Sequence, residues 1–306
     1  MHIDLLVALA GLVVGFIVGL TGMGGGALMT PILVLVFNVQ PLAAVSSDLV
    51  ASMIMKPVGG AVHLRRGTVN RSLVLWLMVG SVPSAFAGVL VIKMLGQSHQ
   101  VQGRLKVLLG LALIVAAVAI VAKGYLQGRA ERSGSSGRRV ESIRVHRAAT
   151  ILVGAIGGLL VGMTSVGSGS LIVAMLLVLY PRLSGSRLVG TDLVQAVPLV
   201  TAAALGHILF GDFRLDLTAS LLVGSIPGVY AGAKLSAWAP DAVIRPALLF
   251  VLLASGLKLL NVSNIELVWI LLAVAAAGVA WWVVTSFRGR VGDAALVDIP
   301  VEVPRA

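Results

Sequence analysis

Long apolar stretches follow one another along the whole chain, and each is close to the roughly 20 residues that a helix needs to cross a bilayer. They lie near residues 5–22, 42–62, 72–95, 104–123, 148–163, 188–210, 217–238, 242–260 and 265–287. Backbone amides cannot stay unpaired in lipid, and these stretches lack the alternation of barrel strands, so helix is the expected secondary structure. We predict an all-α integral membrane protein with roughly 8 to 11 membrane segments.

The composition supports a membrane protein and excludes a soluble core. Hydrophobic residues make up 58% of the chain and charged residues 11%, against about 25% charged residues in soluble domains. The chain has no cysteine, which excludes disulfides, thiolate catalysis and sulfur-ligated metals. We therefore expect neither a cofactor nor a metal site.

Positive charge collects in the connections between the apolar stretches. The formal net charge is +11, and the richest connection, residues 124–147, mixes arginines with glycine and serine. Cytoplasmic loops of membrane proteins carry such an excess, so we attribute the charge to topology and expect no nucleic acid as a partner. This segment is the expected cytoplasmic linker between a first transmembrane repeat, 1–123, and a second, 148–260. An extra transmembrane helix is expected at 261–290, before a polar tail at 291–306.

The two halves of the chain resemble each other over several motifs. GLTGMGGGALMTPILVLVF (19–37) aligns with GMTSVGSGSLIVAMLLVLY (162–180), SSDL (46–49) with GTDL (190–193), and GSVPSAFAG (80–88) with GSIPGVYAG (224–232). Glycine, proline and aspartate recur together at matched positions, which indicates a gene duplication.

Equivalent connections of the two copies differ in charge. Arg65, Arg66 and Arg71 follow the SSDL segment, whereas the matching connection FGDFRLD (210–216) is net negative. Because positive loops stay in the cytoplasm, equivalent loops are expected on opposite sides of the membrane. We predict two inverted-topology repeats, with the N-terminus outside and the C-terminus in the cytoplasm.

The glycine-rich motifs are expected to break helices inside the membrane. The apolar runs after them, 27–37 and 171–180, are too short to cross about 30 Å of hydrocarbon and are expected to be re-entrant or broken. Glycine lets a ligand approach main-chain amides, and a helix start offers unpaired N–H groups at the positive end of a dipole. Two such breaks that meet could bind an anion near the midplane. The alternative is that the glycines only let helices pack closely.

Few ionisable residues lie in the apolar segments, and each is a functional candidate. Asp48, Lys56 and His63 fall on one expected helix, and Asp192 and His207 hold matching places in the second copy. The aspartates could instead cap helix starts, and the histidines could anchor helix ends at the interface. Lys56 has no counterpart, because valine stands at the equivalent position. It is either a substrate-binding cation or a partner for Asp48.

The motifs together resemble the TauE/SafE sulfite exporter family of membrane permeases. The resemblance covers about residues 10–260, and the matching positions are Gly22, Gly24, Gly25, Gly26, Pro31, His63, Gly67, Gly167, Gly169, Gly190, Thr191, Asp192, His207, Gly211, Gly224 and Pro227. It implies transport, usually export, of anions such as sulfite or organosulfonates like sulfoacetate through the bacterial inner membrane. The second glycine motif departs from the family pattern in having SVGSGS and no following proline, and Asp48 stands where a small neutral residue is usual.

These observations predict a secondary transporter rather than an enzyme. The expected substrate-binding residues are Thr21, Gly22, Gly24, Gly25, Gly26, Lys56, Thr164, Ser165, Gly167, Ser168, Gly169, Ser170 and Thr191, and the expected proton-coupling residues are Asp48, His63, Asp192 and His207. A passive anion channel and a permease for another small anion, such as a carboxylate, are the alternatives. No nucleophile elbow, nucleotide loop or metal spacing points to catalysis. The expected partners are the anion, protons, the lipid bilayer and further copies of the chain.

Overall fold

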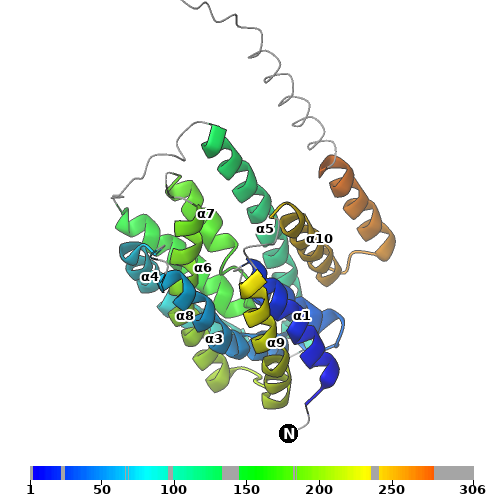
Figure 1. The fold of residues 1–306 in the computed structure, drawn as a ribbon. Coiled ribbons are helices and arrows are strands. Elements are labelled where there is room, and N and C mark those ends of the chain that lie inside the picture. The colour runs from blue at the N-terminus through cyan, green and yellow to red at the C-terminus, as the bar shows by residue number, and fades with distance from the viewer. Residues whose placement is uncertain are drawn as a thin grey trace, which may run out of the picture. The chain divides into compact units, whose positions relative to one another are not determined.

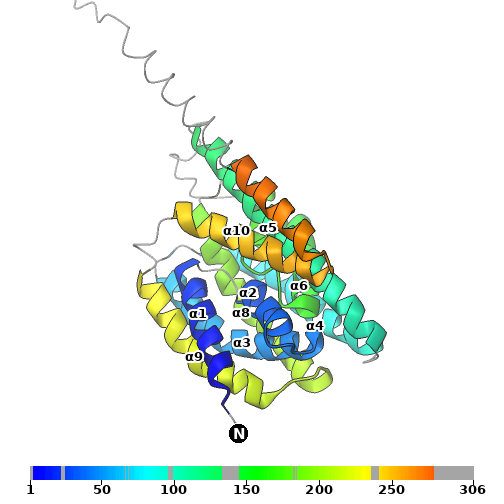
Figure 2. The same ribbon diagram turned by 90° about the vertical axis from the view of Figure 1, so that its right-hand side faces the viewer.

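The computed structural model describes residues 3–21, 25–65, 67, 69–95, 99–132, 145–181, 183, 185–235 and 241–278. In these ranges every regular element is a helix, which confirms the all-α expectation. One compact unit, Met1–Asn261, holds the helices labelled in Figures 1 and 2. They are α1 (Leu5–Thr21), α2 (Gly26–Leu35), α3 (Pro41–Arg65), α4 (Arg71–Leu95), α5 (His99–Arg132), α6 (Arg147–Thr164), α7 (Leu171–Leu179), α8 (Gly185–Phe210), α9 (Leu215–Leu235) and α10 (Asp241–Leu259).

A second unit, Val262–Ala306, contains an apolar helix over Asn264–Gly278. This helix lies within the stretch expected as an extra transmembrane segment. The polar tail expected at 291–306 lies outside the described residues.

Helices long and apolar enough to cross a membrane confirm a multi-pass membrane protein. Within the described ranges they are Arg71–Leu95, Gln100–Ala122, Arg147–Thr164, Gly190–Phe210 and Leu215–Gly232, judged by length and composition. Helix α3 has 25 residues but is far more polar, with buried Ser46, Ser47, Asp48, Ser52 and Lys56. Polar side chains of this kind are tolerated in a membrane protein when they face the interior of the bundle.

Helix α1 packs along α9 through glycines on both helices (Figures 1 and 2). A Cβ atom on Gly15 would lie 2.5 Å from the carbonyl oxygen of Ser225, and one on Gly224 would lie 1.7 Å from that of Ala8. Such distances admit only glycine, so the two backbones are in direct contact. Small residues are the usual means of helix association where lipid removes the hydrophobic driving force.

Helix α4 packs along α6 in the same way, and the contacts correspond residue by residue. Gly158 meets Ser81 as Gly15 meets Ser225, and these residues hold matched positions in the two halves. Likewise, the contact of Gly154 with Leu77 matches that of Gly11 with Leu221. The contact of Gly80 with Ile151 matches that of Gly224 with Ala8. Two copies related by a twofold axis would give this exchange of partners. The inverted orientation of the copies in the membrane stays a prediction.

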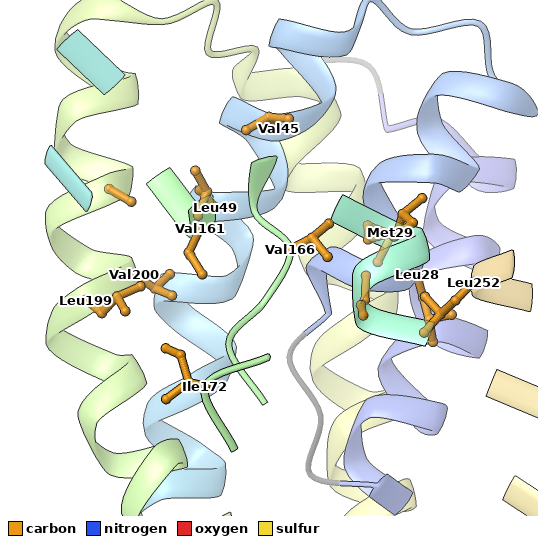
Figure 3. Packing of buried hydrophobic residues seen from close by; sticks show 14 of the residues in the cluster. Leu28, Met29, Val45, Leu49, Val161, Val166, Ile172, Leu199, Val200 and Leu252 are labelled. Carbon is orange, nitrogen blue, oxygen red and sulfur yellow. The ribbon is translucent and has the colours of Figure 1, made fainter. Parts of the chain in front are cut away.

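Helices α3 and α8 pack against each other, and between them they contact α2, α4, α5, α6, α7 and α9. Helix α5 packs on α10, while the short helices α2 and α7 contact α3 and α8 respectively. The main hydrophobic cluster joins these elements, and Figure 3 shows Met29 of α2, Leu49 of α3, Ile172 of α7 and Leu199 of α8 within it. The short helices α2 and α7 therefore pack into the hydrophobic core of the first unit.

Helix α5 extends into the segment that the sequence predicts to be the linker. Helix α5 continues through Arg132, so the part of 124–147 up to that residue is helical. Residues 133–144 lie outside the described residues, and α6 begins at Arg147. Alanine, leucine, arginine and glutamate between 125 and 132 are good helix formers, which accounts for the extension.

Candidate functional site

Each glycine motif lies between the end of one described helix and the start of the next. Helix α1 ends at Thr21 and α2 begins at Gly26, while α6 ends at Thr164 and α7 begins at Leu171. Helices α2 and α7 have 10 and 9 residues. At 1.5 Å per residue each is about 15 Å long or less, too short to cross the hydrocarbon alone. The expected broken helices are present, although Gly22 and Gly24 lie outside the described residues.

The second break, residues 165–170, has a backbone that needs glycine. Gly167 has φ +123° and Gly169 has φ +95°, and Ser165 is left-handed with φ 59°. The Val166 N–H donates a hydrogen bond to Thr164 Oγ1 at 3.1 Å. The N–H groups of Leu171 and Ile172 donate to the carbonyl oxygen of Gly167. These hydrogen bonds stabilise the conformation of the break. The N–H groups of residues 167–170 are not donors in any of them.

The two breaks meet at Gly26 and Ser165. A Cβ atom on Gly26 would lie 1.9 Å from the Ser165 carbonyl oxygen and 2.5 Å from its Oγ atom. The first residue of α2 is therefore in backbone contact with the start of the second break, which is the convergence that the duplicated motifs predict. Gly25 lies beside α3, because its Cβ would come within 3.8 Å of Ser52 Oγ.

Helix α3 presents one polar stripe to the breaks. Asp48, Ser52 and Lys56 are four residues apart and thus share a face of the helix. Asp48 Oδ2 accepts hydrogen bonds from Ser165 Oγ at 2.5 Å and from Thr30 Oγ1 at 3.1 Å. Ser52 lies near the middle of α3, roughly 15–20 Å from either end of the helix. The stripe lies halfway along a helix of transmembrane length.

Lys56 is bonded to the second break. Its ammonium donates to Ser168 Oγ, and its side chain is only 8% exposed. The carboxylates of Asp192 and Asp48 are close enough to attract the ammonium electrostatically. From the sequence, Lys56 is expected to be either a substrate-binding cation or a partner for Asp48. Its hydrogen-bond partner in the structure is the hydroxyl group of Ser168 in the second break.

Several buried polar atoms around the stripe have no hydrogen-bond partner among the residues that the structure describes. They are Asp48 Oδ1, Ser52 Oγ and Ser170 Oγ, with Ser47 Oγ on the adjacent face of α3. A buried polar atom without a hydrogen bond costs roughly 1–3 kcal/mol, so such atoms are rare in folded proteins. Their concentration between α3 and the second break marks a place where a polar ligand or water would be bound.

The matched residues of the second copy are arranged differently. Asp192 Oδ1 accepts from Gln195 Nε2 at 3.0 Å, and Gln195 Oε1 accepts from Ser81 Oγ at 3.1 Å. Thr191 Oγ1 accepts the amide of Asn70 at 3.0 Å, so Thr191 is engaged by the start of α4. The polar stripe on α3 has no equivalent on α8, because Ala196 and Val200 match Ser52 and Lys56.

The aspartates lie inside their helices, and His207 is buried between helices. Asp48 and Asp192 each lie about two turns inside their helices, so neither is an N-cap. His207 is completely buried, with Nδ1 bonded to Ser46 Oγ and Nε2 to the Gly162 carbonyl, both at 2.8 Å. It joins α8 to α3 and α6, and it lies in the last turn of α8. The side chain of His63 lies outside the described residues.

Other expected site residues support the helix ends. Thr21 Oγ1 donates to Ile17 and Thr164 Oγ1 donates to Leu160, in each case to the carbonyl four residues back. Thr30 and Ser52 belong to the cluster but were not among the candidates from sequence. Ser52 could have been found, since it stands midway between Asp48 and Lys56 on the same helical face.

A model of the sulfite exporter TauE/SafE family matches residues 7–259. The chain belongs to the TauE/SafE family. The match runs from within α1 to the end of α10 and includes both breaks, so the candidate site lies within the family's own region. As a member of the TauE/SafE family, the chain is a membrane transporter.

Curated relatives of the same class are matched over nearly their whole length and over more than four fifths of this chain. The chain is 39% identical over 255 residues to the probable membrane transporter protein YjnA of Bacillus subtilis (strain 168), covering 83% of this chain and 98% of the relative. It is 26% identical over 259 residues to the probable membrane transporter protein YdhB of the same organism, covering 84% of this chain and 100% of the relative. No solved structure matches the chain significantly.

Proposed function

We propose that this TauE/SafE protein is a secondary transporter that exports a small sulfur-containing anion across the bacterial inner membrane, linked to the proton motive force. Sulfite or an organosulfonate such as sulfoacetate is the proposed substrate. The family name supports sulfite, and the charge pattern of the loops supports an external N-terminus and a cytoplasmic C-terminus.

The observation that carries the proposal is the position of Lys56. This lysine is buried midway along α3 and bonded to Ser168 in the second break. An anion away from water requires positive charge close by, and Lys56 supplies it. The N-termini of α2 and α7 add the positive ends of two helix dipoles, each equivalent to about half an elementary charge.

The proposed binding site lies between the α3 stripe and the second break. Ser52 Oγ and Ser170 Oγ are both buried, and neither has a partner in the described ranges of the chain, so both can donate to oxygen atoms of a sulfite or sulfonate group. Lys56 would exchange Ser168 for the anion when the substrate enters. The amides of residues 167–170 are further donors to the substrate.

The proposal is tested by counterflow in proteoliposomes with the purified protein. Vesicles loaded with unlabelled substrate are diluted into labelled sulfite, thiosulfate, sulfoacetate, taurine, sulfate or a carboxylate control, and protein-free vesicles give the background. We expect saturable counterflow of sulfite or a sulfonate, and no such signal with the carboxylate.

Three results would overturn the proposal. Counterflow with the carboxylate alone would identify a carboxylate permease. Flux that follows the substrate gradient without saturation or counterflow would identify a passive anion channel. Absence of flux with every anion of the panel would exclude an anion transporter of this class.

A further inference from the structure

The site holds more negative than positive side-chain charge when its carboxylates are ionised. Asp48 and Asp192 both lie within electrostatic reach of Lys56, and all three side chains are buried. Two carboxylates and one ammonium leave an excess of one negative charge. The two helix N-termini together offset about one elementary charge, so an incoming anion would meet no net attraction.

A proton on one carboxylate removes this obstacle, and the contacts indicate which one receives it. Asp48 has one buried oxygen, Oδ1, that accepts no hydrogen bond from any described residue, while its Oδ2 accepts two from hydroxyl groups. An ionised carboxylate with an oxygen left in this state is costly, and a proton on that oxygen lowers the cost. Asp192 already accepts a hydrogen bond from Gln195.

Among the described side chains of α3 and of the helices packed against it, no other charged group competes for this role; the side chain of His63 lies outside the described residues. His207 of α8 has a partner on each ring nitrogen, and α2 and the second break contribute the neutral Thr30 and Ser165. On α9, Asp216 is exposed and Lys234 lies over the ring of Tyr230. On α5, Arg104 is exposed and Lys106 donates to Asn261.

We propose that a monovalent anion and a proton on Asp48 occupy the site together and cross the membrane as a pair. This proposal rests on the anion site of the proposed function, and it confines the link with the proton motive force to the pH gradient. The proton is taken from water on one side, forms an O–H bond at Asp48 Oδ1, and returns to water on the other side. Export is then driven by the outward anion gradient, and an inwardly directed pH gradient opposes it, so the proton gradient sets a limit on export and does not power it.

The charge balance also selects the substrate. With Asp48 protonated, Lys56 and Asp192 cancel, and the helix ends compensate one further negative charge. A monovalent anion such as hydrogen sulfite or a sulfonate is matched, whereas a dianion such as sulfate leaves one charge uncompensated. The pair of proton and monovalent anion carries no net charge, so its movement is independent of the membrane potential.

Methanesulfonate is the probe that separates the protein's proton from that of the substrate. Sulfite changes between monovalent and divalent forms near neutral pH, while methanesulfonate is monovalent throughout. We expect methanesulfonate counterflow to rise as the pH falls, by at most about tenfold per pH unit for a single proton-binding group. Sulfate counterflow should be at least about tenfold slower, a difference that corresponds to 1.4 kcal/mol.

The direction of proton movement tests the pairing in the wild-type protein without any substitution. An inward methanesulfonate gradient should acidify the vesicle lumen, as a trapped pH-sensitive dye reports, and a change of membrane potential should leave the rate unaltered. Lumen alkalinisation would show exchange of the anion for a proton, and no pH change would show uncoupled transport. Either result overturns the pairing while counterflow itself persists. Absence of counterflow would instead overturn the proposed function.

Asp48→Asn keeps the shape of the side chain but cannot ionise. We expect this variant to show no pH dependence of methanesulfonate counterflow and no lumen acidification, because its site is permanently neutral at residue 48. Asp216→Asn, the same change at an exposed position of α9, is the matched control and should keep both. A folded Asp48→Asn variant that keeps the wild-type pH profile would overturn the assignment of the proton to Asp48.

Discussion

Gly26 and Ser165 touch through their backbones, although they belong to different halves of the chain. The space for a Cβ on Gly26 is already taken by the Ser165 carbonyl, at 1.9 Å. This contact brings the start of α2 to the start of the second break. It places Ser165 where its hydroxyl reaches Asp48 on α3.

Gly26→Ala should force the two breaks apart. A methyl group cannot be accommodated against backbone, so we expect a loss of roughly 1–3 kcal/mol in stability and a strong loss of anion counterflow. Thermal unfolding in detergent and the counterflow assay measure the two effects. Gly103→Ala is the matched control, because nothing lies within 4 Å of its Cβ position in α5. A Gly26→Ala protein as stable and active as the Gly103→Ala protein would contradict the contact.

Lys56→Met should weaken anion transport selectively. The variant keeps an unbranched side chain of similar length but loses the charge and the hydrogen bond to Ser168. A hydrogen bond to a charged group contributes about 1.5–3 kcal/mol, so kcat/KM for counterflow should fall by about tenfold or more. Lys106→Met, at a position that donates to Asn261, is the control and should stay near wild type. Equal kinetics in the two variants would remove Lys56 from the site.

Gly15→Ala and Gly158→Ala should destabilise the protein to similar extents. The first Cβ would lie 2.5 Å from the Ser225 carbonyl oxygen and the second 2.3 Å from that of Ser81. These are matched contacts of the α1–α9 and α4–α6 pairs. Melting temperatures of the two variants should drop together, against the same Gly103→Ala control. If only one of them fell, the two interfaces would differ in tightness despite their matched geometry.

His207→Ala should lower stability by leaving two buried groups without partners. Ser46 Oγ and the Gly162 carbonyl would each lose a hydrogen bond, at roughly 1–3 kcal/mol per group. His207→Gln should recover part of the loss, because an amide can both donate and accept. Chemical unfolding of the three proteins gives the order. An alanine variant no less stable than wild type would show that the histidine does not join the helices.

The boundaries of most elements follow closely from hydrophobicity. The stretches expected at 72–95 and 148–163 correspond to α4 (Arg71–Leu95) and α6 (Arg147–Thr164). The short runs expected after the glycine motifs correspond to α2 and α7, because a break in lipid requires glycine and the following apolar run must be helical. These signals are local, and a single sequence contains them.

The interpretation of the aspartates as helix caps was wrong for a local reason. Helix α3 begins at Pro41, well before SSDL, since proline suits the first helical position, where no N–H is needed. Helix α8 likewise begins at Gly185, before GTDL. Cap motifs inside a helix are indistinguishable from true caps until the start of the helix is known.

The sequence by itself determined that the protein lies in a membrane, where its helices and glycine motifs are, and that Lys56 lies in an apolar segment. Each of these depends on residues close together in the chain. Only the tertiary structure decided that the polar groups gather between α3 and the second break. The bonds of Ser165 to Asp48 and of Lys56 to Ser168 join residues 117 and 112 positions apart. Such contacts depend on how closely the glycine faces of distant helices approach, and periodicity within a single helix carries no information about that approach.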